Sequence, residues 1–241
     1  GAIVASVSSS RPNAPRQCSS TPLGIGSRHV GQHLILQPQL PIVALFEHEV
    51  RGFRGIPQAY AVTEFERDDH PDHGLWGFRI EAIMGTPGIT ATLLPYVGAH
   101  NAEMMSRYDR ITAALLLAPD EPSGSVSVGD HGRPVIHYEH REEHKRRLRD
   151  AARAAARIYL AAGATEVTVP NVPAVSVRSE RDLDRIDNMV LRAASAPLVS
   201  AHQQGTVRLG TSAEVGGADP DGQVFGTRGV YVMDASIFPS S

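Results

Sequence analysis

One cysteine, Cys18, is all that this chain of 241 residues contains, so no disulfide can form within it. It lacks any run close to the roughly 18 apolar residues that cross a bilayer, and its first residues do not resemble a signal peptide. A net charge of -3 provides no general attraction for nucleic acid, which calls for a basic face. We therefore expect no transmembrane segment, no nucleic-acid partner and a cytoplasmic location.

A dinucleotide-binding turn is also missing. The pattern G-x-G-x-x-G lets a pyrophosphate lie at a helix N-terminus, and its third glycine allows close packing of that helix on a strand. The nearest candidate begins at Gly24 and Gly26 but has His29 in the last position. The chain therefore lacks the usual cradle for a dinucleotide.

What is present is typical of a globular protein. With 41% hydrophobic and 20% charged residues the chain can bury a substantial core, and its length permits one large domain or two small ones. Lys145 is the only lysine among 23 basic residues, and alanine is abundant, which indicates a GC-rich bacterial coding sequence.

Seven segments within the first 138 residues are predicted to be strands. Residues 2–7 read as a strand followed by a loop, and six later segments alternate apolar with polar residues between turn residues. These six segments are 41–46, 59–65, 75–83, 112–117, 124–128 and 134–138. The alternation is typical of an antiparallel sheet with one solvated face, and we expect one such sheet.

Two helices are predicted. From about Glu142 to Ala162 apolar or small residues recur at spacings of three and four, and Gly163 is a natural C-cap. A second helix is expected from Ser179, where Ser179 and Asp182 can form a capping box, to Ala194. Helices packed on an antiparallel sheet give an α+β fold.

Three blocks punctuated by glycine follow one another near the carboxyl terminus. They read His202-Gln-Gln-Gly-Thr-Val-Arg-Leu-Gly210, Asp219-Pro-Asp-Gly-Gln-Val-Phe-Gly226 and Gly229-Val-Tyr-Val-Met-Asp-Ala-Ser-Ile-Phe-Pro239. In order and spacing they resemble the signature of the glucose-methanol-choline (GMC) flavoprotein oxidoreductases, H-x-x-G-T-x-R-M-G, V-D-P-x-G-x-V-x-G and L-x-V-x-D-A-S-x-F-P. Upstream, Val30-Gly31-Gln-His-Leu34 is similar to the V-G-x-x-L element that leads into the family's substrate domain.

The resemblance implies an FAD cofactor, held mainly by a Rossmann-like half that carries the turn missing here. In the family an Asn-Pro that meets the flavin follows the F-P, so a second catalytic residue is expected beyond Ser241. Gly1-Ala2-Ile3 is similar to the family's A-G-A-I flavin-contact strand. We therefore interpret the chain as part of a larger flavoenzyme whose missing partner is the FAD-binding half.

This interpretation divides the chain into three parts. Residues 1–38 would be a segment of an incomplete α/β FAD-binding domain with a connecting loop. Residues 39–200 would be the α+β substrate-binding domain, and residues 201–241 would return with the catalytic histidine and the flavin-contact motif. The isolated chain is expected to be inactive and not to retain FAD.

The resemblance implies that His202 is the catalytic base, which takes the substrate hydroxyl proton while a hydride leaves the same carbon for the flavin. Histidine suits this task because imidazole accepts and returns protons near neutral pH. Gly205 and Gly210 are expected to let the backbone pass close to the ring system. A lone histidine is more often a hydrogen-bonded structural residue, and it is the surrounding signature that favours catalysis.

The resemblance also implies cofactor contacts at Asp234 and Ala235, beside Gly1 and Ala2. Val230 to Met233 reads as a buried strand, and ligands often lie beyond the carboxyl ends of strands. Asp234 also has the residue type of a helix N-cap, and both roles can hold together.

Two alternatives from other classes remain open. His140-Arg-Glu-Glu143-His144 matches the H-x-x-E-H pattern, in which two histidines bind zinc and a glutamate activates water. The surrounding cations oppose a bound zinc ion, so no metal site is predicted. The chain could also be a non-catalytic structural or binding module.

The resemblance also predicts a class of substrate. Short segments, among them Gly55-Ile56-Pro57 and Pro95-Tyr96-Val97-Gly98, look most similar to the long-chain alcohol oxidase branch of the family. An apolar primary alcohol is therefore the first expectation, with a sugar or polyol as the alternative. Whether the electron acceptor is oxygen or another carrier, and the oligomeric state, are not encoded in these residues.

Overall fold

The computed structural model describes residues 25–56, 58–70, 74–83 and 85–241. Cys18, the predicted strand over residues 2–7 and the predicted contacts Gly1 and Ala2 lie outside the described residues. The chain divides into two compact units, each built from separate stretches of sequence. Unit 1 comprises Gly1–Leu36, Asp120–Glu139 and Ala201–Ser241, and unit 2 comprises Gln37–Pro119 and His140–Ser200. The division into 1–38, 39–200 and 201–241 remains a prediction.

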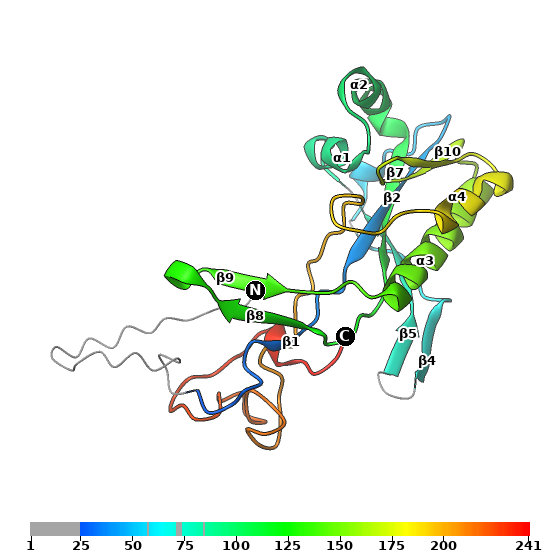
Figure 1. Ribbon diagram of the computed structural model, residues 1–241. Helices are drawn as coiled ribbons and strands as arrows, with labels where there is room; N and C mark the ends of the chain where they lie inside the picture. Colours follow the sequence, from blue (N-terminus) through cyan, green and yellow to red (C-terminus); the bar gives the residue numbers. More distant parts are fainter. Residues whose placement is uncertain (1–24, 57, 71–73, 84) are drawn as a thin grey trace. The chain divides into compact units, whose positions relative to one another are not determined.

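Unit 2 is built on a six-stranded antiparallel sheet of strand order β11-β10-β2-β7-β6-β3 (Figure 1). Its strands are β2 (Gln39–Leu45), β3 (Ala61–Val62), β6 (Arg79–Ile83), β7 (Ile111–Leu117), β10 (Glu166–Val169) and β11 (Val175–Val177). The central pair is in register, with Ile42 opposite Ala114 and Val43 opposite Ala113. Antiparallel sheets packed with helices confirm the α+β fold class.

Helix α3 (Glu142–Ala161) covers one face of this sheet. Leu148 and the small residues Ala151, Ala152, Ala155 and Ala156 are almost completely buried in the same cluster as Leu40, Ile42 and Leu116. Alanine side chains allow the helix axis to approach the sheet closely, and each fully buried leucine or isoleucine contributes about 1.5–3 kcal/mol. The helix predicted from Glu142 to Ala162 is confirmed, and Gly163 follows it with a φ of 94°.

Helices α1 (Pro87–Leu93) and α2 (Gly98–Ser106) pack against the other face. A second cluster there joins Leu94 and Met104 to Val43, Leu45 and Ile111 of the sheet. These helices were not predicted, because they are short and carry little amphipathic pattern. Strand β2 is buried along its whole length, since helices cover both of its faces.

The prediction of one sheet from residue 41 to residue 138 is wrong. Strands β8 (Gly124–Val128) and β9 (Pro134–His137) form a separate sheet in unit 1, in the order β1-β8-β9, with β1 being Gln32–Leu34. The predicted strand over 75–83 is divided into β5 (Gly74–Gly77) and β6, because Gly77 has a φ of 102°. Strands β4 (Glu66–His70) and β5 form a two-stranded sheet of their own.

The prediction of a long second helix, from Ser179 to Ala194, is also wrong. The capping box at Ser179 and Asp182 is present, but only the 3-10 turn η4 (Glu180–Asp182) and the single turn α4 (Asp184–Asp187) follow it. The side chains of Asn171 and Ser195 donate hydrogen bonds to the Val190 carbonyl, at 2.9 and 2.6 Å. These bonds satisfy the carbonyl outside a helix, so the apolar spacing that suggested a helix does not produce one.

Unit 1 is held together mainly by backbone hydrogen bonds between loops. Both hydrophobic clusters found among the described residues consist of unit 2 residues. The expectation that Val230 to Met233 is a buried strand is wrong, because Tyr231 is 56% and Met233 82% exposed and the segment forms one isolated bridge, between Tyr231 and Gln223. The Asp219 carbonyl accepts a hydrogen bond from the Gly222 amide in a tight turn.

Candidate functional site

The segment that follows His202 and the predicted flavin contacts Asp234 and Ala235 lie in the same local structure of unit 1. Val207 donates a backbone hydrogen bond to the Ser236 carbonyl at 2.8 Å, and Leu209 donates one to the Ile237 carbonyl at 2.9 Å. The segment that follows His202 therefore runs beside η5 (Ala235–Ile237). Two blocks of the signature thus come together, although residues 211–228 separate them along the chain.

A third segment supports the same backbone from the amino-terminal side. Ile35 and Gln204 exchange backbone hydrogen bonds at 2.9 and 3.0 Å, and Gly31 donates to the Thr206 carbonyl at 2.8 Å. The V-G-x-x-L element therefore holds the residues immediately after His202. The backbone next to His202 is fixed, while its side chain is exposed.

The glycines of the signature are explained by close contacts within this chain. Gly205 has a φ of 91°, and a Cβ there would overlap the carbonyl oxygen of His33. A Cβ on Gly210 would lie 2.7 Å from the Cα of Gly216. Both glycines permit close approach of one part of this chain to another, so contact with a ring system is not needed to explain them.

This role predicts that Gly205→Ala destabilises unit 1 by about 1–3 kcal/mol, from left-handed strain together with the steric overlap. Gly229→Ala is the matched control, because Gly229 has a φ of 72° but open space where its Cβ would be. Chemical denaturation of both variants measures the difference. Equal losses of stability would show that the His33 contact imposes no cost.

Asp234 has the N-cap geometry that was considered for it. Its Oδ1 accepts the Ser236 backbone N–H at 2.9 Å and also the Ser236 hydroxyl. The Ser236 hydroxyl bond is the main reason that the pKa of Asp234 is lowered. Asp234 is therefore an oriented carboxylate, and Oδ2 is without a hydrogen-bond partner in the described part of the chain.

A partly buried histidine pair in unit 1 was not foreseen. His29 Nδ1 lies 2.8 Å from His33 Nε2, and His29 Nε2 lies 2.6 Å from the Glu214 carbonyl oxygen. Burial, followed by the nearby Arg208 and His29, lowers the pKa of His33. The spacing of four residues was visible in the sequence, but the Glu214 partner comes from a distant segment. The pair ties the V-G-x-x-L element to the loop that follows Gly210.

The H-x-x-E-H motif has the geometry of a structural site. His144 is 3% exposed, with Nδ1 bonded to His140 Nε2 at 2.5 Å and Nε2 bonded to the Ala118 carbonyl at 2.9 Å. Both ring nitrogens of His144 are therefore used within the protein, and Glu143 pairs with Arg146 at 2.6 Å. No group of three His, Cys, Asp or Glu side chains suited to a metal ion occurs among the described residues.

The pair formed by His140 and His144 predicts that the protein loses stability in acid. Burial lowers the pKa of His144 to about 3 and that of His140 to about 4, both below the ordinary value of 6.5. The unfolded chain therefore takes up these protons first, so stability is complete above about pH 6.5 and falls toward pH 3, by up to about 1.4 kcal/mol per pH unit for each group.

His144→Gln should make this pH dependence shallower by about 1 kcal/mol per pH unit, because glutamine can still donate to Ala118 but does not titrate. Urea denaturation at several pH values from 7 to 4 measures the slope. His137→Gln, which changes an exposed histidine of β9, is the control and should leave the slope unchanged. Parallel profiles for wild type and His144→Gln would show that His144 is not held neutral by burial.

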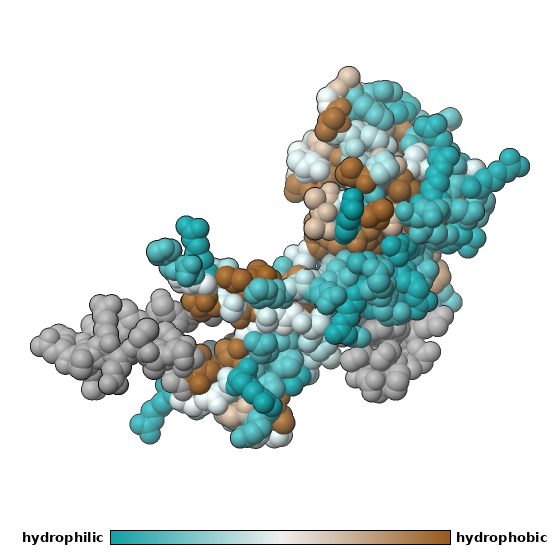
Figure 2. All heavy atoms as spheres, in the orientation of Figure 1, coloured by the Kyte–Doolittle hydropathy of each residue, from teal (hydrophilic) through white to brown (hydrophobic). Residues whose placement is uncertain are grey.

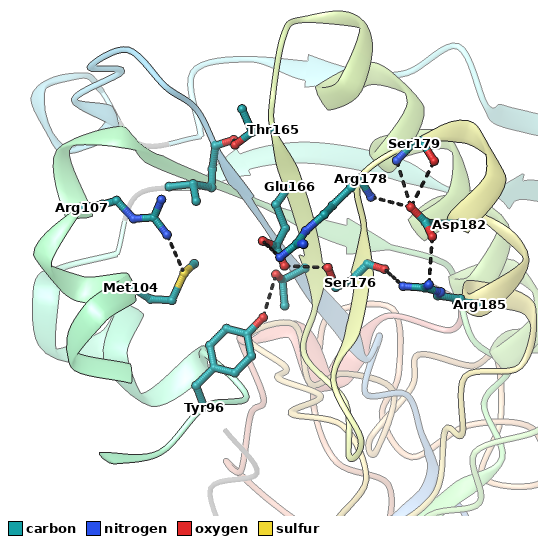
Figure 3. A network of polar contacts seen from close by, with 12 residues as sticks. Tyr96, Met104, Arg107, Thr165, Glu166, Ser176, Arg178, Ser179, Asp182 and Arg185 are labelled. Carbon is teal, nitrogen blue, oxygen red and sulfur yellow. Dashed lines mark hydrogen bonds and ion pairs between the residues drawn. The ribbon is translucent and has the colours of Figure 1, made fainter. Parts of the chain in front are cut away.

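A second polar network lies in unit 2 (Figure 3). Glu166 accepts hydrogen bonds from Ser176 at 2.6 Å and Arg178 at 3.0 Å, and Tyr96 bonds to Thr168 at 3.3 Å. The Glu166 carboxylate is therefore neutralised by partners on β11 and its flanking loop. The Tyr96 bond joins the connection between α1 and α2 to β10, and the Glu166 bonds join β10 to β11 and Arg178, so these contacts have a structural role.

Comparison with known proteins assigns the three carboxyl-terminal blocks to a family. The family model described as GMC oxidoreductase matches residues 120–241. A GMC-type oxidoreductase of Mycobacterium tuberculosis, itself uncharacterised, is 32% identical over 220 residues, which are 89% of this chain and 33% of that protein. A long-chain-alcohol oxidase of Arabidopsis thaliana is 27% identical over 232 residues, 90% of this chain and 30% of that protein.

The fold is similar to that of solved oxidases. A variant of formate oxidase from Aspergillus oryzae, studied for its FAD modification, matches with a TM-score of 0.56 and 16% identity, over 89% of this chain and 44% of that one. At this identity the match shows the fold alone. The chain spans about a third of the length of the curated relatives that it matches.

Proposed function

This chain belongs to the GMC oxidoreductase family, and from that membership we propose that it is part of an FAD-dependent enzyme that oxidises an alcohol at its CH–OH carbon. One observation carries the proposal: the segment that follows His202 is hydrogen-bonded to η5, and Asp234 is the N-cap residue of η5. The long-chain-alcohol oxidases among its relatives support an alcohol substrate, and an apolar primary alcohol fits them best.

His202 is the proposed general base. Its imidazole accepts the hydroxyl proton of the substrate, which makes loss of hydride from the same carbon much easier than from a neutral alcohol. FAD, when bound, supplies the hydride acceptor. The backbone hydrogen bonds of Gln204 and Gly205 support this role, because they fix the chain two residues after His202, whose side chain is exposed.

Asp234 and Ala235 are the proposed cofactor contacts, together with Gly1 and Ala2. The Asp234 carboxylate suits FAD, because Ser236 orients one of its oxygens and the other can accept a hydrogen bond from a ribityl or ribose hydroxyl. The helical turn η5 is short, so we assign it orientation of the carboxylate rather than binding of a phosphate.

The FAD-binding half is the proposed partner of these residues. Its contribution is supported by the length of the relatives, of which this chain spans about a third. A cytoplasmic location is proposed from the cysteine usage alone. No geometry favours the zinc-dependent hydrolase, because both ring nitrogens of His144 are already bonded within the protein.

Anaerobic mixing of the flavin-loaded enzyme with primary alcohols of increasing chain length tests the proposal. We expect the flavin to be bleached by alcohols, with a lower half-saturating concentration for each added methylene until the apolar site is filled. A sugar or polyol series is the comparison. If polyols alone bleach the flavin, the substrate is a polyol and not an apolar primary alcohol. If no alcohol bleaches the flavin, the proposed reaction is overturned.

A further inference from the structure

The loops of unit 1 are arranged largely by polar contacts. Both hydrophobic clusters among the described residues belong to unit 2. On the face shown in Figure 2, hydrophilic and hydrophobic side chains are mixed over the loops of unit 1 that surround β1 in Figure 1. Polar side chains that bond to distant segments therefore contribute much of the order of unit 1. His29 and His33 form such a contact, and the proposed reaction assigns no role to either of them.

His29 holds the loop of residues 211–217. Its Nε2 lies 2.6 Å from the Glu214 carbonyl oxygen. Ser27, two residues earlier, has its hydroxyl oxygen 2.6 Å from the Gly216 carbonyl oxygen. Both side chains are buried. Two carbonyl groups of one loop are thus fixed by two neighbouring side chains.

The hydrogen-bond partners determine which nitrogen of each ring carries a proton. A carbonyl oxygen only accepts, so His29 Nε2 donates to Glu214 and leaves Nδ1 as the acceptor of the neutral ring. His33 Nε2 lies 2.8 Å from this Nδ1 and therefore donates to it. When both rings are charged, two N–H groups face each other at this distance and the bond between the rings is lost.

The backbone around His33 supports the residues that follow His202. A Cβ on Gly205 would overlap the His33 carbonyl oxygen, so the two backbones are in contact there. Two residues farther along, Ile35 and Gln204 exchange backbone hydrogen bonds. Movement of the turn that contains His33 therefore moves the backbone two residues after His202.

The surroundings of the pair oppose a second charge. Burial, followed by Arg208 and His29, lowers the pKa of His33. The charged residues on the segments around the pair are Arg28, Glu121, Arg208 and Glu214, and β8, which pairs with β1, has none. An open pair takes up protons more readily than a closed one. The contact is therefore complete above about pH 6.5 and weakens in acid.

We propose that the His29–His33 pair is a positioning element for the His202 base, closed when its rings are neutral and opened when both are charged. A closed pair keeps the backbone after His202 in place, so that the imidazole meets each alcohol molecule in the same position. An open pair lets this backbone move, which makes productive approach rarer. The inference rests on the proposed role of His202, but its first test needs neither FAD nor alcohol.

Hydrogen exchange at single amides of the 241-residue chain tests the coupling. His33→Asn removes the ring and keeps a residue type that tolerates the left-handed φ of 64°. The Gln204 amide, which donates to Ile35, should exchange about three- to tenfold faster, the effect of losing one hydrogen bond that supports it. His131→Asn is the matched control, because His131 is an exposed histidine of unit 1 with a φ of 57°, and exchange should not change.

The pH dependence of exchange is the second readout. From pH 7 to pH 4, after correction for the exchange of free amides, protection of the Gln204 amide should fall in wild type and in His131→Asn. It should stay constant in His33→Asn, where one ring of the pair is missing. A role confined to the loop predicts faster exchange at Gly216 and Gly217 with Gln204 unchanged. That result, or equal exchange in wild type and His33→Asn, would overturn the proposal.

The flavin-loaded enzyme shows whether the positioning serves the reaction. His33→Asn should slow flavin reduction at saturating alcohol about three- to tenfold, and leave the half-saturating alcohol concentration and the flavin content near those of wild type. An unchanged rate together with faster Gln204 exchange would exclude a positioning role. If His202→Ala leaves the rate unchanged, the proposed base is wrong, and the exchange experiment still decides whether the pair holds this backbone.

Discussion

Replacing His202 with alanine should slow flavin reduction by alcohol about 100-fold or more in the flavin-loaded enzyme. A positioned general base typically contributes 10²–10⁴-fold to a proton transfer, and alanine has no group that accepts a proton. The flavin content should stay near that of wild type, because Asp234 and Ser236 keep their mutual hydrogen bonds without the imidazole. Rapid mixing of the variant with alcohol under anaerobic conditions measures the rate of bleaching.

His137→Ala is the matched control for this experiment, since it removes an exposed histidine of unit 1 that lies in β9. His137→Ala should reduce the flavin at the wild-type rate. The pH dependence separates a base from a positioning residue, because loss of the base should remove the acid limb of the rate profile. An unchanged rate in folded, flavin-loaded His202→Ala would remove His202 from the mechanism.

The isolated chain should be colourless and should not oxidise alcohols, even with FAD added. A dinucleotide needs a preorganised cradle for its pyrophosphate and enough enclosed surface to offset the freedom lost on binding. The described part of this chain supplies an oriented carboxylate at Asp234, and the sequence contains no G-x-G-x-x-G turn. Isothermal titration should therefore give a Kd on the order of 1 mM or weaker for FAD.

Sedimentation should also show self-association of the isolated chain, because unit 1 exposes Val128, Ile136 and Met233. Contiguous apolar patches of more than a few hundred Å² are unusual on monomers. Addition of the FAD-binding half should restore both colour and alcohol oxidation. A yellow preparation with stoichiometric flavin, or dye reduction by these residues alone, would show that the site is complete within this chain.

The sequence by itself determined the features that depend on local spacing. Apolar residues three and four apart predict α3, and alternation predicts β7 and β8, because both patterns follow from the geometry of one segment. The family membership was also readable, since the three glycine-punctuated blocks keep their order and spacing from His202 to Pro239. His202 and Asp234 were identified as candidates from those blocks, and their chemical roles remain proposals.

Only the tertiary structure decided which segments meet. Strand β8 pairs with β1 instead of the unit 2 sheet, and Gly205 is required by the carbonyl of His33, which lies far away along the chain. The second helix fails because Asn171 and Ser195 capture the Val190 carbonyl, and His144 becomes structural because the Ala118 carbonyl lies beside it. Each outcome depends on a partner distant in sequence, and periodicity within a segment carries no information about that partner.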